Sequence, residues 1–355
     1  MKQCFKHVLI LTMVFVLLFI LSSCGNSDAD NSDQQSQAQS IVNNFGIMDN
    51  SDDSFYMVDT IDEFDYDSLA NFNKNSGGYV IEIENVLYYS NGSDGNRLYK
   101  TELPSTDQER VGKFSSEFSL GSMQYYNNCI YYKNRTKLQT PIKTEYATVA
   151  YINKIVYYSL DTEIETVLID GEPIIDFVIA DDSVYYTTYT KDENGALYRM
   201  SLSEKSSEKL TDFLYPMTIQ ESNGKLYLGF NEKLAVFDTK DNTVNYYPMP
   251  HYGYVVSGDT LYFQNFNDYC VYKMEYDSEK NTYDAENIQK ISDVMVSSFC
   301  IYGDNLIVSA FDNKIYCINR ATSEKTVMAV GDSLIITPAG ISYKIDDSIK
   351  LCRFD

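Results

Sequence analysis

The sequence predicts an all-β protein: a seven-bladed β-propeller of four-stranded antiparallel blades, with the ring closed by an N-terminal strand. Two observations predict this fold. A short motif, in which a turn residue precedes an aliphatic residue and usually tyrosine, recurs about every 42 residues, which is the period of propeller blades. The 32 tyrosines among 355 residues gather in these copies, within segments that alternate in the manner of strands.

Seven copies of the motif mark the second strand of each predicted blade. The first copy is Asn85-Val86-Leu87-Tyr88-Tyr89, and the last, 339–343, is the weakest. Most copies open with Asn, Asp or Gly, which favour tight turns. The aliphatic residues at their centres are Leu87, Ile130, Val184, Leu226, Leu261, Leu306 and Ile341.

Each copy has further strand-like runs around it. An apolar run such as Tyr79-Val80-Ile81 precedes the motif, and a more polar run such as 207–210 ends the unit. Between them lies a third strand, which in most copies has its own aromatic residue and which begins near Leu98, Val156, Leu197, Leu234, Val271, Ile315 and Leu351. This pattern predicts four antiparallel strands per blade, with six or eight blades as the alternatives to seven.

The last unit is one strand short. It begins at Ser333 and ends at Phe354, so no outer strand follows its third one. The apolar run Phe55–Val58 is otherwise unassigned, and we predict that it supplies this strand and closes the ring. Closure removes the open sheet edges on which other chains would pair.

Through its Asn/Asp-x-aliphatic-Tyr-Tyr and Leu-Tyr-Arg/Lys strands, the chain resembles a family of β-propeller domains. The family is named for its likeness to the propeller of low-density-lipoprotein-receptor-related proteins, and it occurs in lipoproteins of Gram-positive, Clostridia-type bacteria. The resemblance covers about 300 residues and implies the fold; the function of the family is largely unassigned. Receptor propellers carry Tyr-Trp-Thr-Asp where this chain has Tyr-Tyr without the aspartate, so no receptor ligand is implied.

The N-terminus reads as an export signal. Lys2 and Lys6 precede an apolar run, Val8–Leu21, and two serines then lead to Cys24. The stretch Leu21-Ser22-Ser23-Cys24 resembles the lipobox of bacterial lipoproteins, which implies lipidation of Cys24. A plain signal peptide and a membrane anchor are the alternatives, but a span needs about 20 apolar residues.

The predicted organisation has three parts. Residues 1–23 are a lipoprotein signal peptide, 24–43 a lipidated cysteine and polar tether, and 44–355 the propeller. The lipid bilayer is then a partner through acylated Cys24, and the protein is expected on the extracytoplasmic face of the cell membrane. The net charge of −23 argues against binding nucleic acid.

No residue pattern predicts catalysis, a metal site or a cofactor. His251 is the one histidine that follows the signal, and five cysteines follow Cys24 without a C-x-x-C pair. The absence of tryptophan argues against quinoprotein and sialidase propellers, whose repeats use it. We therefore expect a protein that is not an enzyme.

Two segments are candidate contact surfaces. A long loop is predicted from Lys133 to Asn153, and it carries the basic residues Lys133, Arg135, Lys137 and Lys143 in an acidic chain. The alternative for it is a longer hairpin with a solvated basic face. Between two blades, an inter-blade loop is predicted over Tyr246–Tyr252; its aromatic residues, with His251 and Tyr252, are of a kind that interfaces favour. Its alternative is aromatic packing between blades.

The predicted function is a non-catalytic binding or scaffolding module for a protein or glycan at the cell envelope. The alternative is a propeller enzyme acting on carbohydrate, which needs a pair of carboxylates facing the central channel. Four acidic residues lie on or near first strands: Glu82, Glu84, Asp176 and Glu221. A scaffold similar to the lipoprotein propeller of outer-membrane assembly is a further alternative.

Overall fold

The computed structural model is all-β, and its small antiparallel sheets form a β-propeller, as predicted. A single 3-10 helix, η1 (Gly92–Asp94), is the one helical element among the residues described. Within that part of the chain, no helix is long and apolar enough to cross a membrane. The signal segment 1–23, Cys24, the tether and Phe55–Val58 lie outside the described residues. The structure describes residues 46–47 and 80–353, except 103–106, 144–147, 190–193, 215–217, 231–232, 249–250, 278–279, 281, 285–286, 338–339 and 346–347.

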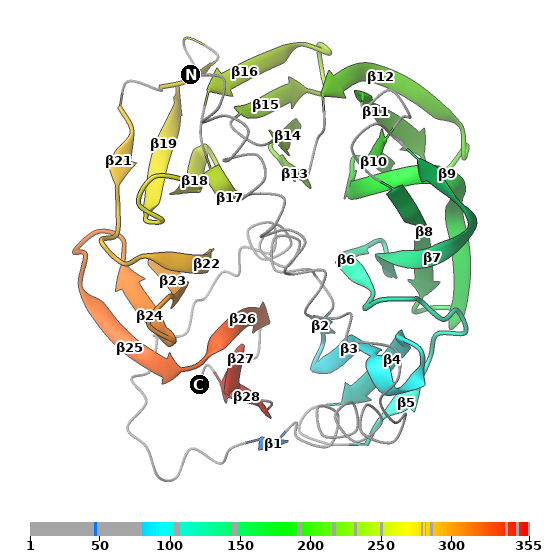
Figure 1. The fold of residues 1–355 in the computed structure, drawn as a ribbon, viewed down its shortest axis with the longest axis horizontal. Coiled ribbons are helices and arrows are strands. Elements are labelled where there is room, and N and C mark those ends of the chain that lie inside the picture. The colour runs from blue at the N-terminus through cyan, green and yellow to red at the C-terminus, as the bar shows by residue number, and fades with distance from the viewer. Residues whose placement is uncertain are drawn as a thin grey trace. The chain divides into compact units, whose positions relative to one another are not determined.

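Three sheets are four-stranded meanders in which each strand pairs antiparallel with the next (Figure 1). The first consists of β2 (Val80–Ile83), β3 (Val86–Asn91), β4 (Arg97–Glu102) and β5 (Glu109–Arg110). Another consists of β13 (Thr218–Ser222), β14 (Lys225–Phe230), β15 (Lys233–Asp238) and β16 (Val244–Pro248). The third consists of β22 (Val296–Tyr302), β23 (Asn305–Ala310), β24 (Lys314–Asn319) and β25 (Lys325–Val330). In each, the repeated motif is the second strand, as predicted.

Two sheets vary this plan at their outer strand. One of these sheets consists of β17 (His251–Ser257), β18 (Thr260–Asn265), β19 (Val271–Asp277), β20 (Thr282–Tyr283) and β21 (Gln289–Lys290). The two short strands β20 and β21 both pair with the outer edge of β19. The other holds β26 (Asp332–Thr337), β27 (Gly340–Ile345) and β28 (Ser348–Arg353). Its fourth strand is β1 (Gly46–Ile47), which pairs with β28 in parallel.

The largest sheet has seven strands and contains two copies of the motif. Its members are β6 (Gly121–Tyr126), β7 (Cys129–Lys143), β8 (Thr148–Ser159), β9 (Ile164–Ala180), β10 (Ser183–Tyr189), β11 (Asn194–Ser201) and β12 (Ser207–Leu214). β9 has 17 residues and serves both halves: Ile164–Ile174 lies along β8, and Ile174–Ala180 lies along β10. The two motif copies therefore share one continuous strand.

The turn residue that opens each motif adopts a left-handed backbone in four copies. The φ angles of Asn85, Asn128, Asp182 and Gly224 are 66°, 56°, 53° and 72°, and the preceding residue is also left-handed in each case. Two consecutive left-handed residues make the two-residue hairpin turn whose twist matches antiparallel strands. Asn, Asp and Gly adopt this conformation at the lowest cost, which explains their recurrence.

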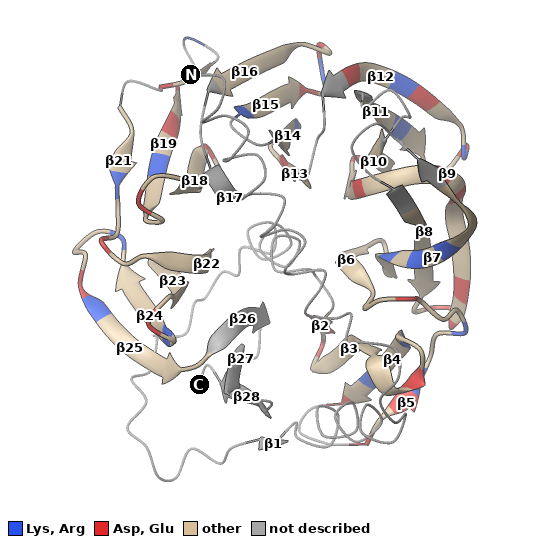
Figure 2. Cartoon of the chain, viewed as in Figure 1, with Lys and Arg blue, Asp and Glu red and all other residues tan. Residues whose placement is uncertain are grey.

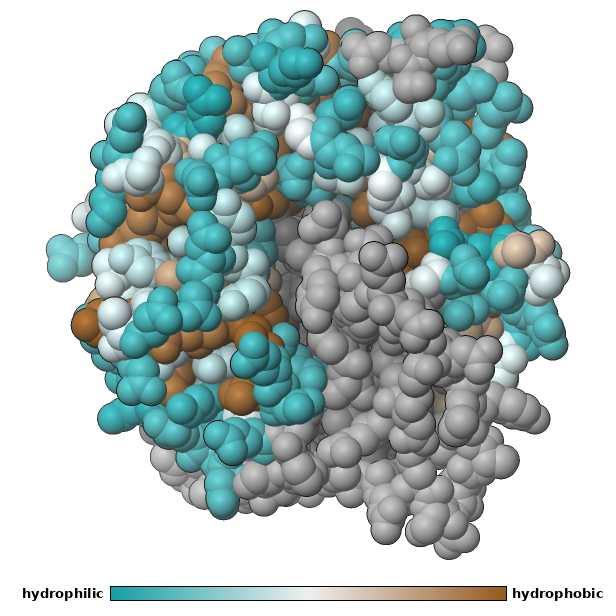
Figure 3. Space-filling view, turned by 180° about the vertical axis from the view of Figure 1, so that it is seen from behind, coloured by the Kyte–Doolittle hydropathy of each residue, from teal (hydrophilic) through white to brown (hydrophobic). Residues whose placement is uncertain are grey.

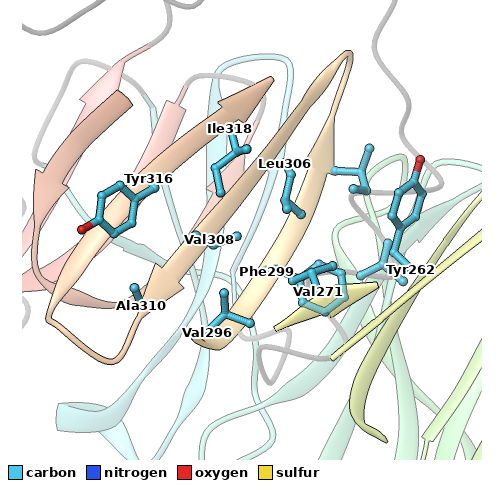
Figure 4. Close-up of a cluster of buried hydrophobic side chains, with 11 residues drawn as sticks. Tyr262, Val271, Val296, Phe299, Leu306, Val308, Ala310, Tyr316 and Ile318 are labelled. Carbon is cyan, nitrogen blue, oxygen red and sulfur yellow. The ribbon is translucent and has the colours of Figure 1, made fainter. Parts of the chain in front are cut away.

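The adjacent aliphatic residue and tyrosine of the motif pack on opposite neighbours. Leu226 lies in a buried cluster with Val178 and Tyr185 of the preceding sheet, while Tyr227 packs with Tyr254 and residues of the next sheet. Successive side chains of a strand point to opposite faces, so one motif fills two interfaces. Figure 4 shows such an interface, in which Tyr262 meets the layer formed by β22, β23 and β24.

Candidate binding surface on the β7–β8 hairpin

β7 and β8 form a hairpin that runs beyond its sheet. β6 pairs with β7 only as far as Lys133, and β9 pairs with β8 only from Asn153 onward. Past these points the two strands pair with each other alone, to the Lys143–Thr148 pair. The predicted loop from Lys133 to Asn153 is therefore wrong, and the alternative of a longer hairpin is correct. We call 134–143 and 148–152 the hairpin extension.

The loop prediction failed because this strand is polar on both faces. Basic residues stand at every second position, Lys133, Arg135 and Lys137, and polar or small residues fill most positions between them. A period of two places these three residues on one face of β7. Figure 2 shows the resulting run of Lys and Arg along β7. The alternation itself was the signal that could have identified the strand.

Lys133 belongs to a buried ion pair rather than to an exposed arm. Its Nζ lies 3.0 Å from Oδ1 of Asp176, and the two side chains are 20% and 4% exposed. The Asp176 carboxylate also accepts hydrogen bonds from the Ser122 hydroxyl at 2.8 Å and the Ile219 amide at 3.1 Å. Ser122 is in β6 and Ile219 in β13. This carboxylate therefore joins β6 and β7 to the neighbouring sheet.

Arg135 is held in place by the segment that leads to β6. Its guanidinium carbon lies 5.0 Å from the centre of the Phe118 ring, and its Nε donates to Oδ1 of Asn153 at 3.1 Å. The Phe118 ring in turn meets Tyr151 edge-on, at 5.1 Å. Partial burial of the guanidinium lowers the pKa of Arg135, but arginine stays charged in proteins. Sequence reasoning missed Phe118 and Tyr151, which lack any motif.

Lys137 is the basic residue of β7 best suited to contact a partner. It is exposed, stands opposite Tyr151 and lies farther from the base of the extension than Lys133 and Arg135. Lys143 pairs with Thr148 at the far end, and its side chain lies outside the described residues. The surface thus offers Lys137 and the outer side of Arg135, beside aromatic rings. Such an arrangement suits an acidic or planar partner group.

The prediction of an inter-blade loop over Tyr246–Tyr252 is wrong for the residues described there, which are strand. The segment spans the end of β16 and the start of β17, where His251 stands opposite Asn265; the side chains of His251 and Tyr252 lie outside the described residues. Tyr247 is 6% exposed and meets the Tyr283 ring edge-on at 5.6 Å. Aromatic packing between sheets, the alternative interpretation, therefore holds for Tyr247, whereas Tyr246 is 56% exposed.

The four carboxylates of the enzyme alternative have different surroundings. Asp176 is held in the ion pair with Lys133, and Glu221 accepts a hydrogen bond from the Gly224 amide at 2.9 Å. Glu82 is buried and Glu84 is exposed in a turn. Among the described residues, no group of three or more His, Cys, Asp or Glu side chains is arranged to hold a metal ion.

Comparisons with known proteins concern the fold alone. No family model matches the chain, and no curated protein gives a significant match. A puromycin-hydrolyzing peptidase of Mycobacterium tuberculosis is similar with a TM-score of 0.51 at 10% identity, over 71% of this chain and 44% of that one. The AfRom2 CNH domain has a TM-score of 0.50 at 7% identity, over 77% and 92%. A computationally designed protein, Ika8, has a TM-score of 0.49 at 10% identity, over 77% of this chain and 95% of that one.

Proposed function

We propose that this protein is a lipoprotein on the extracytoplasmic face of the cell membrane, anchored through Cys24. Its propeller acts as a non-catalytic module that binds or scaffolds an envelope protein or glycan. The observation that carries the binding role is the hairpin extension. A strongly acidic chain presents a two-stranded ribbon with exposed basic side chains beyond its sheet. A two-stranded ribbon alone is at best marginally stable in water, so a partner surface would stabilise the extension.

The charge of the extension favours an acidic partner. Lys137 and Arg135 offer positive charge on a chain of net charge −23, so most of the remaining surface repels anions. Anionic envelope polymers and acidic faces of membrane proteins carry the complementary charge.

The test reverses the charge of the extension without touching its base. Lys137→Glu leaves the Lys133–Asp176 pair and the Arg135 contacts intact, so the fold should persist. Lys240→Glu is the matched control, because Lys240 is exposed in the turn between β15 and β16. We expect crosslinking in living cells and mass spectrometry to show loss of the captured partner for Lys137→Glu alone. Equal capture of the partner by both variants would show that the extension does not bind it.

The anchor has a separate test. Cys24→Ala removes the thiol that would receive the lipid, so the protein should leave the membrane fraction. Intact mass measurement of the wild-type chain should give the mass of a diacylated N-terminal cysteine. If Cys24→Ala stays in the membrane pellet after carbonate washing, the anchor lies elsewhere.

We also propose that the propeller has seven blades and that an N-terminal strand closes its ring. Along β8, β9 takes the place of the outer strand of one blade. Along β10, it takes the place of the inner strand of the next blade. Successive first strands touch from β2 through β6, β9, β13, β17 and β22 to β26, and β26 touches β2. Hydrogen exchange tests the closing strand. Slow exchange at Gly46–Ile47 supports closure through β1, and slow exchange only at Phe55–Val58 supports closure through that run.

The resemblance to lipoprotein propellers of Clostridia-type bacteria stays a proposal of the same kind. It rests on the motif strands, and it agrees with the proposed anchor. A diacylated Cys24 together with seven blades would support it, and an unmodified N-terminus would count against it.

A further inference from the structure

Three connections meet at an exposed apolar cluster that the sequence motifs do not single out. The turn between β18 and β19 contributes Tyr269, the segment before β22 contributes Met295, and the turn between β23 and β24 contributes Phe311. Met295 is 50% exposed and Phe311 54% exposed. The Tyr269 and Phe311 rings meet edge-on, with centroids 5.4 Å apart. We call these three residues the apolar cluster.

The backbone holds the apolar cluster in place. The Phe311 amide donates to the Met295 carbonyl at 3.1 Å, and the Val296 amide donates to the Tyr269 carbonyl at 2.9 Å. The two turns and the connecting segment are therefore tied to one another. A surface whose parts are already fixed loses little conformational entropy when a partner binds.

Tyr269 adopts a backbone conformation that a bulky residue rarely takes. Its φ is 59°, in the left-handed region, and the corresponding turn of the next sheet has Asn313 there, with the same φ. Asparagine tolerates this region, whereas a large side chain is strained in it. Strain that persists at an exposed position commonly marks a functional site. Here it brings a tyrosine ring against the exposed Phe311 ring.

Carboxylates outnumber cations around the apolar cluster. The Asp293 side chain is 98% exposed, and Asp268 and Asp312 are partly exposed. Lys290 lies between Asp268 and Asp293, at 3.1 Å and 3.3 Å, and Lys314 lies 3.5 Å from Asp312. With three carboxylates to two lysines, this rim has a net negative charge, and an apolar centre within it is complementary to an apolar side chain flanked by basic residues.

We propose that the apolar cluster is a docking site for a cationic segment of a partner protein, which buries an apolar side chain against Met295 and Phe311. Most of the surface of a second copy of this acidic chain would meet like charge there, and so would an anionic lipid surface. The inference rests on the binding role proposed above, but it uses a different surface from the hairpin extension.

The probe is a labelled 12-residue peptide with four lysines around a central Phe-Leu pair, compared with the same peptide carrying Ser-Ser. We expect the full-length chain to bind the Phe-Leu peptide at least about tenfold more tightly in fluorescence anisotropy, because an apolar side chain is buried. Phe311→Ser and Met295→Ser should abolish this difference. The matched control is Val327→Ser, because Val327 is 45% exposed on β25, and it should retain the difference.

Three outcomes would overturn the proposal. The first is an unchanged Phe-Leu preference in both cluster variants, once urea unfolding has shown that they are folded. The second is equal binding of a peptide with glutamate in place of lysine. The third is concentration-dependent dimerisation that Phe311→Ser removes, which would make a second copy the occupant. Since Lys137→Glu should leave peptide binding unchanged, failure here and failure of the hairpin extension can be told apart.

Discussion

The buried ion pair between Lys133 and Asp176 allows a quantitative prediction. Replacing Asp176 with alanine removes the carboxylate that faces the Lys133 ammonium and accepts the Ile219 amide. Removing one partner of a buried pair costs about 3–5 kcal/mol, because the other charge stays buried without compensation. Lys133 is 20% exposed and can partly reach water, so we expect the lower end, about 3 kcal/mol.

The assay is urea unfolding followed by far-ultraviolet circular dichroism. The control is Asp170→Ala, which breaks the pair between Asp170 and Lys154, 2.9 Å apart and with side chains 49% and 26% exposed. An exposed pair of this kind contributes at most about 1 kcal/mol. The free energy of unfolding should therefore fall about three times as far in Asp176→Ala as in the control. The melting temperature of Asp176→Ala should be lower than that of the wild type by roughly 6–10 °C.

A double replacement refines the test. Lys133→Met with Asp176→Asn removes both charges and keeps an oxygen acceptor for the Ile219 amide. Removing both partners of a buried pair is far less costly than removing one. The double variant should thus be more stable than Asp176→Ala. Equal losses for Asp176→Ala and Asp170→Ala, or a double variant no better than Asp176→Ala, would refute the reasoning.

Three further predictions concern stability. Burial raises the pKa of Tyr158 to about 12, so between pH 10 and 12 the unfolded chain releases a proton that the folded chain keeps. The free energy of unfolding should therefore fall as pH rises through this range, and Tyr158→Phe should make the fall smaller in urea titrations. Glu84 has a left-handed φ of 50°, which glycine adopts without strain, so Glu84→Gly should raise the urea midpoint slightly. Glu102→Gly in the extended strand β4 should lower the urea midpoint, and a lower midpoint in both variants would contradict this prediction. Buried Glu165 accepts hydrogen bonds from two backbone amides and the Tyr132 hydroxyl. Glu165→Ala should therefore cost about 3 kcal/mol, and Glu165→Gln, which keeps one oxygen acceptor, should cost less; equal costs would contradict the role of Glu165 as a hydrogen-bond acceptor.

The strands of the fold could be predicted because local chemistry determines them. Asn85, Asn128 and Asp182 sit where the hairpin turns need a left-handed backbone. The aliphatic-tyrosine pair recurs because each sheet has a neighbour on both faces, as Leu226 and Tyr227 illustrate. Such requirements repeat along the chain and are visible in it.

The candidate site was predicted less well because its properties depend on distant residues. Nothing near Lys133 indicates that it pairs with Asp176, which lies on another strand of the same sheet. Charge composition therefore identified a basic segment but not which cations are available to a partner. The contact of Tyr269 with Phe311 likewise joins turns of two sheets, and no single motif contains both.

The continuous strand β9 determines how the molecule can be divided. Between β12 and β13 the chain passes from one sheet to the next, so cutting or rejoining it there would leave both hydrogen-bond ladders whole. From β6 to β12 the ladder has no such break, because β9 pairs on both sides. Limited proteolysis and circular permutation should therefore treat residues 121–214 as one indivisible cooperative unit. Any duplication or exchange of modules in this molecule has to move that double unit as a whole.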